Sequence, residues 1–146
     1  MVAGMVVKLT TKDIGENWSL IKQALAEAPP LAGELDGKYH RMLSALMCGA
    51  YECWFVFDEE DKLKYCIITG FLNDDLSGNK NLLIYLCYSY DKLTKRDKAS
   101  GIIAMKHYAI SQGCTQIVGY SNLDYIINLA EASGGSADYR FFAIPI

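Results

Sequence analysis

The sequence lacks the features that would assign it at once to several large classes of protein. It has only two histidines, and its five cysteines show no C-x-x-C spacing, so clustered zinc ligands are not expected. It has no excess of positive charge, because 14 Lys and Arg against 17 Asp and Glu leave a net charge of −3. The molecule as a whole therefore offers no electrostatic footprint for nucleic acid. We expect no bound metal and no nucleic-acid partner.

Long hydrophobic runs are also missing. Met1–Lys8 has no basic region followed by a long apolar stretch, so we do not expect a secretory signal. The longest apolar runs, such as Leu82–Cys87, have the length of a strand and are too short to span a membrane. An odd number of cysteines without a secretory signal favours reduced thiols and a cytoplasmic location. Cys53, Cys66 and Cys87 lie in apolar runs, where we expect thiols that behave as small hydrophobic residues.

The overall composition is typical of a globular protein. Hydrophobic residues make up 51% of the chain and charged residues 21%, which excludes a disordered tail. A length of 146 residues suits one domain of ordinary size. No internal repeat or linker divides the chain, so we expect a single domain over residues 1–146.

The first part of the chain predicts a strand followed by helices. Val6–Thr10 has the pattern of a strand, and Thr11 or Asp13 then caps a helix that Pro29-Pro30 ends. A second helical stretch is expected at about Tyr39–Cys48. The apolar stripe of the first helix has spacings of four, three and four, and consists of Ile14, Trp18, Ile21 and Leu25.

Three strands are expected next. Tyr51–Phe57, Leu63–Leu72 and Leu82–Tyr90 are rich in aromatic and apolar residues and are separated by short polar loops. Loops of this length and composition between such runs predict an antiparallel meander.

The clearest helix is expected to begin at Thr94, which has capping-box spacing to Asp97, with Asp in place of the usual Glu or Gln, and to end at Gly113 in a left-handed cap. A strand at Gln116–Tyr120, a helix at Asn122–Ser133 and a last strand at Tyr139–Ile144 complete the prediction. The side of the Thr94 helix expected to be buried carries Ala99, Ile102, Ile103, Met105, Ala109 and Ile110.

The predicted order is therefore β-α-α-β-β-β-α-β-α-β. An antiparallel meander followed by a β-α-β crossover makes a mixed, mostly antiparallel sheet with helices on both faces. The expected fold class is α/β (α+β).

This order resembles the GNAT N-acyltransferase fold over nearly the whole chain, and several residues agree with it. Leu86 matches the first position of the family's L-x-V-x-P-x-x-R-G-x-G-x-G pattern, and Gly113 matches the glycine that closes the next helix. Gly70-Phe71 resembles the glycine-aromatic step on the preceding strand. Asn122 and Gly134 resemble the residues that open and end the family's last helix. The resemblance implies acetyl-CoA as cosubstrate and an amine as acceptor.

The chain departs from the family pattern at Tyr88, Tyr90, Leu93, Arg96, Lys98 and Ala130. Family members have glycines where Arg96 and Lys98 stand, and those glycines let backbone amides approach the CoA pyrophosphate at a helix N-terminus. Many have at the position of Ala130 the tyrosine that protonates the leaving thiolate. Two functions therefore stay open. One is an acetyl-CoA-dependent N-acetyltransferase, in the cytoplasm. The other is a non-catalytic GNAT-like structural or binding module, such as the degenerate phage-encoded proteins of which some belong to the virion.

The resemblance also implies where the cosubstrate binds. Backbone amides near Leu86–Tyr88 would hold the acyl carbonyl, and the cofactor-binding set would further include Lys95, Arg96, Lys98, Ala99 and Asn122. Four basic residues crowd Lys92–Lys98 at a helix N-terminus, where positive charge is disfavoured, which suggests a bound anion. The alternative is a solvated helix end whose charge Asp91 and Asp97 partly compensate.

Tyr88 and Tyr85 are the catalytic candidates, because a phenol could protonate the departing thiolate in place of the missing tyrosine. Strand alternation predicts that Tyr85 points away from Tyr88. The alternative is that both tyrosines simply pack against the sheet with a wet hydroxyl. Glu52 or Asp58 could act as a base, although nothing in their spacing favours this over a surface role. His107 is expected on the surface or half-buried.

The end of the chain predicts an interaction surface. GNAT proteins usually finish with a hairpin of two strands, but only about a dozen residues follow Gly134, which is enough for Tyr139–Ile144 alone. A sheet edge carrying Phe141, Phe142 and Ile144 would need a cover, so we expect self-association or a protein partner there. The alternative is that this strand is central and its aromatic residues belong to the core.

Overall fold

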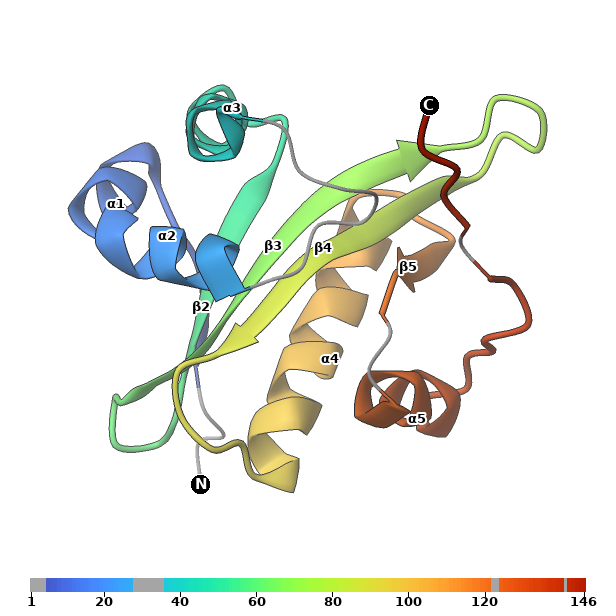
Figure 1. Ribbon diagram of the computed structural model, residues 1–146. Helices are drawn as coiled ribbons and strands as arrows, with labels where there is room; N and C mark the ends of the chain where they lie inside the picture. The colour runs from blue at the N-terminus through green and yellow to red at the C-terminus, as the bar shows by residue number, and fades with distance from the viewer. Residues whose placement is uncertain (1–4, 28–35, 122–123, 141) are drawn as a thin grey trace.

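A computed structural model describes residues 5–27, 36–121, 124–140 and 142–146, and its elements follow the predicted order up to the last helix (Figure 1). They are β1 (Val6–Lys8), α1 (Thr11–Glu16), α2 (Trp18–Glu27), α3 (Lys38–Met47), β2 (Glu52–Phe57), β3 (Leu63–Asn73), β4 (Lys80–Ser89), α4 (Lys95–Ser111), β5 (Gln116–Gly119) and α5 (Asp124–Ala132). The predicted helix end at Pro29-Pro30 and the predicted helix start at Asn122 lie outside the described residues.

The strands form one sheet in the order β1-β2-β3-β4-β5. The first four strands pair antiparallel, and β4 pairs with β5 in parallel, so the prediction of a mixed, mostly antiparallel sheet is confirmed. Helices α1, α2 and α3 lie on one face of this sheet and α4 lies on the other (Figure 1). The parallel pairing follows from the α4 crossover, since a tight hairpin cannot join parallel strands.

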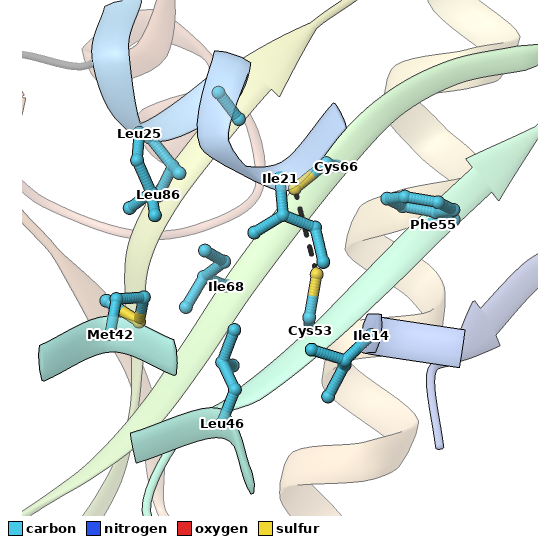
Figure 2. Close-up of a cluster of buried hydrophobic side chains, with 11 residues drawn as sticks. Ile14, Ile21, Leu25, Met42, Leu46, Cys53, Phe55, Cys66, Ile68 and Leu86 are labelled. Atoms are coloured by element: carbon cyan, nitrogen blue, oxygen red, sulfur yellow. Dashed lines mark hydrogen bonds between the residues drawn. The ribbon is translucent and has the colours of Figure 1, made fainter. Parts of the chain in front are cut away.

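The central strands β2 and β3 are buried on both faces over most of their length, which explains why they are largely apolar. On β2, Cys53 and Phe55 join a cluster with residues of α1, α2 and α3, shown in Figure 2. Trp54 and Val56, one step along the same strand, join a second cluster with Met105 and Ala109 of α4. Successive side chains of a strand point to opposite faces, so each face receives every second residue.

The first predicted helix is in fact two helices, and its start was placed wrongly. Thr10 caps α1: its hydroxyl accepts a hydrogen bond from the Asp13 amide at 3.2 Å, and the Asp13 carboxylate accepts one from the Thr10 amide at 3.0 Å. Asn17 interrupts the helix, and its side-chain amide donates to the Asp13 carbonyl at 2.9 Å. Asn side chains compete with the backbone in this way, which an apolar stripe does not reveal.

The capping box of α4 and the left-handed Gly113 are confirmed, but the expected buried side is partly wrong. Ile103 and Ile110 are 57% and 73% exposed, and Ala99 is also exposed. The buried residues are Asp97, Gly101, Met105 and Ala109, a narrow stripe with a spacing of four. Two of these four are not hydrophobic, because the helix approaches the sheet through a paired carboxylate and a glycine. Apolar periodicity therefore finds Met105 and Ala109 but misses Asp97 and Gly101.

A β-bulge in β4 reverses the alternation of its side chains. Ile68 of β3 pairs with Leu86 and Thr69 pairs with Ile84, which leaves Tyr85 as an extra residue. Before the bulge, Leu82 and Ile84 face α4; after it, Leu86 and Tyr88 pack against the cluster under α1–α3. The ring of Tyr85 meets Tyr51, which packs on that same cluster, so Tyr85 and Tyr88 share a face and the prediction that they point apart is wrong.

The predicted last strand, Tyr139–Ile144, is wrong for the residues that the structure describes. Residues 139, 140 and 142–144 have no regular structure, and Phe141 lies outside the described part of the chain. Tyr139, Phe142 and Ile144 are 95%, 79% and 77% exposed. The segment runs past β5 without pairing with it (Figure 1). Apolar side chains alone do not make a strand, because a strand needs a neighbour for its backbone hydrogen bonds.

Candidate functional site: the open edge of β4 and the groove between α4 and α5

Strand β4 is paired on both sides over only half of its length. Its pairing with β5 ends at Ile84 opposite Gly119, whereas its pairing with β3 continues to Ser89 opposite Tyr65. Beyond Ile84, no strand of the described chain borders the second edge of β4. The two parallel strands therefore part immediately beside the bulge.

The phase of the hydrogen bonds shows which backbone groups face this open edge. The Tyr90 amide donates to the Lys64 carbonyl on β3 at 2.9 Å. Backbone groups of successive residues point to opposite edges of an antiparallel strand. The N–H and C=O groups of Leu86 and Tyr88, like those of Tyr90, are therefore directed at β3. Cys87 and Ser89 consequently present their N–H and C=O groups to the open edge.

The two residues predicted to hold the acyl carbonyl flank the one that is best placed to do so. Leu86 has its side chain in the core, and the hydroxyl of half-buried Tyr88 accepts a hydrogen bond from Gln23 at 3.3 Å. Between them, Cys87 is exposed, so the prediction that it is a core residue is wrong. Desolvation of the thiolate and the neighbouring Cys66 thiol raise the pKa of Cys87 to about 12. Cys87 is therefore protonated near neutral pH and a poor nucleophile.

Tyr85 lies at the bulge and packs against the ring of Tyr51, for which Gly70 leaves room. The rings of Tyr85 and Tyr51 meet edge to face, with centroids 5.6 Å apart. A Cβ atom at Gly70 would lie 2.6 Å from the Tyr51 ring, so any other residue there would displace Tyr51. The Tyr85 side chain stays 42% exposed. The glycine-aromatic step seen in the sequence thus provides room for the neighbour of a catalytic candidate.

A groove of about 260 Å³ lies between α4 and α5. Lys95 and Lys98 from the first turn of α4 stand beside apolar walls formed by Ile102, Ile103 and Leu129, and the remaining lining residues are Ala99 and Ser133. Three of the predicted cofactor-binding residues, Lys95, Lys98 and Ala99, therefore line one groove. Two cations beside an apolar surface suit a ligand that has both an anionic and an apolar part.

Arg96 and Asn122 were predicted at the same site, but the structure does not bring them there. Arg96 is directed to the turn between β2 and β3, where its guanidinium donates to the carboxylate of Glu59. Asn122 lies outside the described residues. The basic segment is thus divided, with Arg96 paired on one side and Lys95 and Lys98 in the groove on the other.

The alternative interpretation of the sequence named Asp91 and Asp97 as the charges that compensate the start of α4, and the structure pairs them with Lys62, just before β3, and Lys64, at the start of β3. Lys62 bonds to Asp91 at 2.6 Å and, with the Lys92 amide, holds the pKa of that carboxyl at about 2. Lys64 lies 3.7 Å from Asp91 and 3.6 Å from the buried carboxylate of Asp97. The sequence did not suggest Lys64, because a lysine inside an apolar strand carries no motif.

The other candidates lie away from the open edge. The Glu52 carboxylate accepts a hydrogen bond from the Tyr108 hydroxyl and pairs with Lys8 at 3.1 Å. The Asp58 carboxylate accepts from the amides of Glu60 and Lys62 in a turn. His107 is exposed on α4. Within the described ranges there is no cluster of three or more metal-ligating side chains, and no helix is long and apolar enough to cross a membrane.

A second hollow, of about 370 Å³, lies on the other face between β1, α1 and the β2–β3 hairpin. Its lining is apolar except for Asp13 and Asn17, and both of these side chains bond within their own helix. It therefore offers less chemistry than the open edge of β4 and the groove beside α4.

Solved structures similar to this chain are acetyltransferases. Ribosomal-protein-alanine N-acetyltransferase from Brucella melitensis biovar Abortus 2308 is 16% identical with a TM-score of 0.71, over 97% of this chain and 99% of that chain. A predicted acetyltransferase with acetyl-CoA from Clostridium acetobutylicum is 14% identical with a TM-score of 0.68, over 97% of this chain and 96% of that chain. An aminoglycoside acetyltransferase from an uncultured soil metagenomic sample, in complex with sisomicin, is 14% identical with a TM-score of 0.70, over 98% and 95%. No protein-family model and no curated protein matches the chain. At these identities the likeness shows a shared fold.

Proposed function

We propose that this chain, which has the GNAT acetyltransferase fold, is an N-acetyltransferase that transfers an acetyl group from acetyl-CoA to an amine. The observation that carries the proposal is the combination of an open β4 edge with the lysine-lined groove at the start of the helix that follows this strand. The solved acetyltransferase with acetyl-CoA and the one with the amine sisomicin support the choice of cosubstrate and acceptor class.

The residues present fit acetyl-CoA at two points. The Cys87 amide, which is directed at the open edge, would donate a hydrogen bond to the thioester carbonyl and stabilise the charge that develops on its oxygen. The ammonium groups of Lys95 and Lys98 would pair with phosphate oxygens, and the apolar walls of the groove would contact less polar parts of the molecule. Arg96 would act only indirectly, through its bond to Glu59.

When bound, acetyl-CoA supplies an acyl group activated as a thioester. A C–N bond forms between the amine and the acyl carbon while the C–S bond breaks, the amine loses one proton and the leaving thiolate gains one. We assign the proton donor to Tyr85, because its side chain is 42% exposed beside the open edge, whereas the side chain of Tyr88 is half-buried and packs on the cluster under α1–α3. The high pKa of Cys87 favours this direct transfer over an acyl-cysteine intermediate.

The test is calorimetric titration with acetyl-CoA. We expect binding that weakens with added salt, and a loss of about tenfold in the Lys95→Ala/Lys98→Ala variant, the equivalent of about 1.4 kcal/mol. A Lys12→Ala/Lys106→Ala variant removes the same charge from two exposed helical positions and should bind like the wild type. No binding at millimolar concentration would eliminate the enzyme and leave the non-catalytic module as the function.

Catalysis is tested by mass spectrometry of amine acceptors incubated with acetyl-CoA. Tyr85→Phe should lower kcat by about 10²-fold or more with little change in the affinity for acetyl-CoA, as expected for loss of a general acid. Tyr88→Phe removes a hydroxyl from the same face and serves as the matched control. Equal activity of Tyr85→Phe and wild type would remove Tyr85 from the mechanism.

A further inference from the structure

The first turn of α4 contains the carboxylate of Asp97, and the ammonium group of Lys64 on β3 neutralises its charge. Resting on the proposed function, we infer that Lys64 of β3 is a positioning residue for the phosphate groups of the cosubstrate: it cancels the charge of Asp97, so that the first turn of α4 can receive a phosphate. Lys64 touches neither the groove nor the open edge, so its effect is transmitted through Asp97.

Lys64 and Asp97 form an ion pair that is nearly removed from solvent. Their side chains are 10% and 9% exposed, and the Lys64 Nζ lies 3.6 Å from Oδ2 of Asp97. The same carboxylate oxygen accepts a hydrogen bond from the Thr94 amide at 2.9 Å and so belongs to the helix cap. A buried charge that loses its partner is strongly unfavourable, and the field of such a charge reaches its neighbours with little screening.

The residue after Lys64 holds the same turn by a second contact. The Tyr65 hydroxyl donates to the Asp97 carbonyl at 2.7 Å. A Cβ atom at Gly101, one turn further along α4, would lie 2.0 Å from that hydroxyl oxygen, so glycine is needed for this approach. Two successive residues of β3 therefore fix the first turn of α4, one by charge and one by a hydrogen bond.

The position of Asp97 explains why neutralisation matters for a phosphate. Lys95 and Lys98, which line the groove, lie two residues before and one residue after Asp97 on the same helical turn. An uncompensated carboxylate there would lower the potential that these two cations create. Of the charged groups around the turn, Arg96 is bound to Glu59, and Asp91 is bound to Lys62 as well as to Lys64. The buried ammonium group of Lys64 lies beside the Asp97 carboxylate.

The decisive experiment is a double-mutant cycle with acetyl-CoA and inorganic pyrophosphate as ligands, measured by calorimetry. Lys64→Met should weaken both ligands by about tenfold or more, because Asp97 then repels phosphate. Lys64→Met/Asp97→Asn should recover affinity to within a few-fold of the wild type, although the ion pair is gone. Lys64→Arg should keep affinity. The control is Lys62→Met, which removes an exposed partner of Asp91 and should change affinity by less than about twofold.

A merely structural role for the pair predicts the opposite pattern, in which the double variant binds as weakly as Lys64→Met or more weakly. That result, or unchanged binding in Lys64→Met, would overturn the inference. If Lys64→Met does not fold, Asp97→Asn alone decides: undiminished or tighter binding supports the inference, and a loss of about tenfold contradicts it. In turnover, Lys64→Met should raise KM for acetyl-CoA and leave kcat close to that of the wild type.

The same titrations separate this inference from the proposed function. If the wild type binds pyrophosphate but not acetyl-CoA, and Lys64→Met weakens the binding of pyrophosphate, the inference stands and the proposed function is wrong. Wild-type binding of acetyl-CoA that is indifferent to Lys64 keeps the function and loses the inference. Wild-type protein that binds neither ligand loses both.

Discussion

The two faces of the sheet are closed to different degrees. Under α1, α2 and α3, completely buried side chains such as Ile21 and Ile68 interlock with Cys53 and Cys66 from the strands (Figure 2). On the other face, α4 packs through a narrow stripe that contains a glycine and a carboxylate, and no α5 side chain that the structure describes is buried. The groove between α4 and α5 and the ion pair between Lys64 and Asp97 belong to this second side.

The difference indicates a division of labour between the faces. Burial of apolar surface contributes most of the stability of a domain, and the α1–α3 face supplies a large part of it. The α4–α5 side keeps polar and backbone groups accessible, which a binding site needs and a close-packed core excludes. We therefore expect mutations on the α1–α3 face to lower stability, and mutations on the α4–α5 side to lower binding.

The largest effect is expected for truncation in the α1–α3 cluster. Ile68→Ala should lower the free energy of unfolding by about 2–5 kcal/mol, because Ile68 is fully buried and its loss leaves a cavity. Ile103→Ala on α4 is the matched control, and because Ile103 is 57% exposed its effect should stay within about 0.5 kcal/mol. Denaturant titration measures both values. Similar losses for the two variants would contradict the comparison between the faces.

A smaller effect is expected where α4 approaches the sheet most closely. Gly101→Ala should destabilise the protein by about 1–3 kcal/mol, because the added methyl group collides with the Tyr65 hydroxyl. Tyr65→Phe in the same chain removes that oxygen and should restore part of the loss. Gly15→Ala is the control, because nothing lies within 4 Å of a Cβ atom there and alanine favours a helix. Gly101→Ala as stable as wild type would show that the contact at α4 is loose.

The cysteines should differ in reactivity according to their exposure and their pKa. Cys48 is exposed and should react first with a thiol reagent, whereas Cys53 and Cys66 should react only on unfolding. A hydrogen bond with Cys53 and burial also raise the pKa of Cys66 well above its usual value.

Cys87 is accessible but has a pKa of about 12. The rate at which it reacts with a thiol reagent should therefore rise steadily with pH up to that value as thiolate forms. Acetyl-CoA should protect Cys87 and leave Cys48 unchanged in peptide-mapping mass spectrometry. Equal protection of both would contradict binding at the open edge.

The smallest effect on stability is expected in the segment after α5. Phe142→Ser/Ile144→Ser should change the free energy of unfolding by less than about 0.5 kcal/mol, because both side chains are exposed. The expectation of self-association stays a prediction, now with this segment and the outer edge of β5, which no described strand borders, as the surfaces. Analytical ultracentrifugation should show association that the double variant weakens. A wild-type chain that sediments as a monomer at high concentration would contradict it.

Much of the fold was predictable because the signals are local. The capping box between Thr94 and Asp97 and the left-handed Gly113 involve residues close in sequence, and both are confirmed. The order of strands and helices follows from apolar runs and the polar turns between them, and it holds as far as α5. In the candidate site, the same locality placed Lys95, Lys98 and Ala99 at the start of α4, where they line the groove.

The sequence by itself determined the elements, their order and their caps, since each depends on interactions within a few residues. The tertiary structure decided the rest. Pairing with β3 makes Tyr85 a bulge and turns the Cys87 backbone to the open edge, and contact with Tyr65 selects which stripe of α4 is buried. Lys64 and Asp97 meet only because β3 passes the end of β4, although they are far apart in the chain. The sequence also did not reveal that the described residues after α5 form no strand, because a strand forms only when another backbone is present to accept its hydrogen bonds.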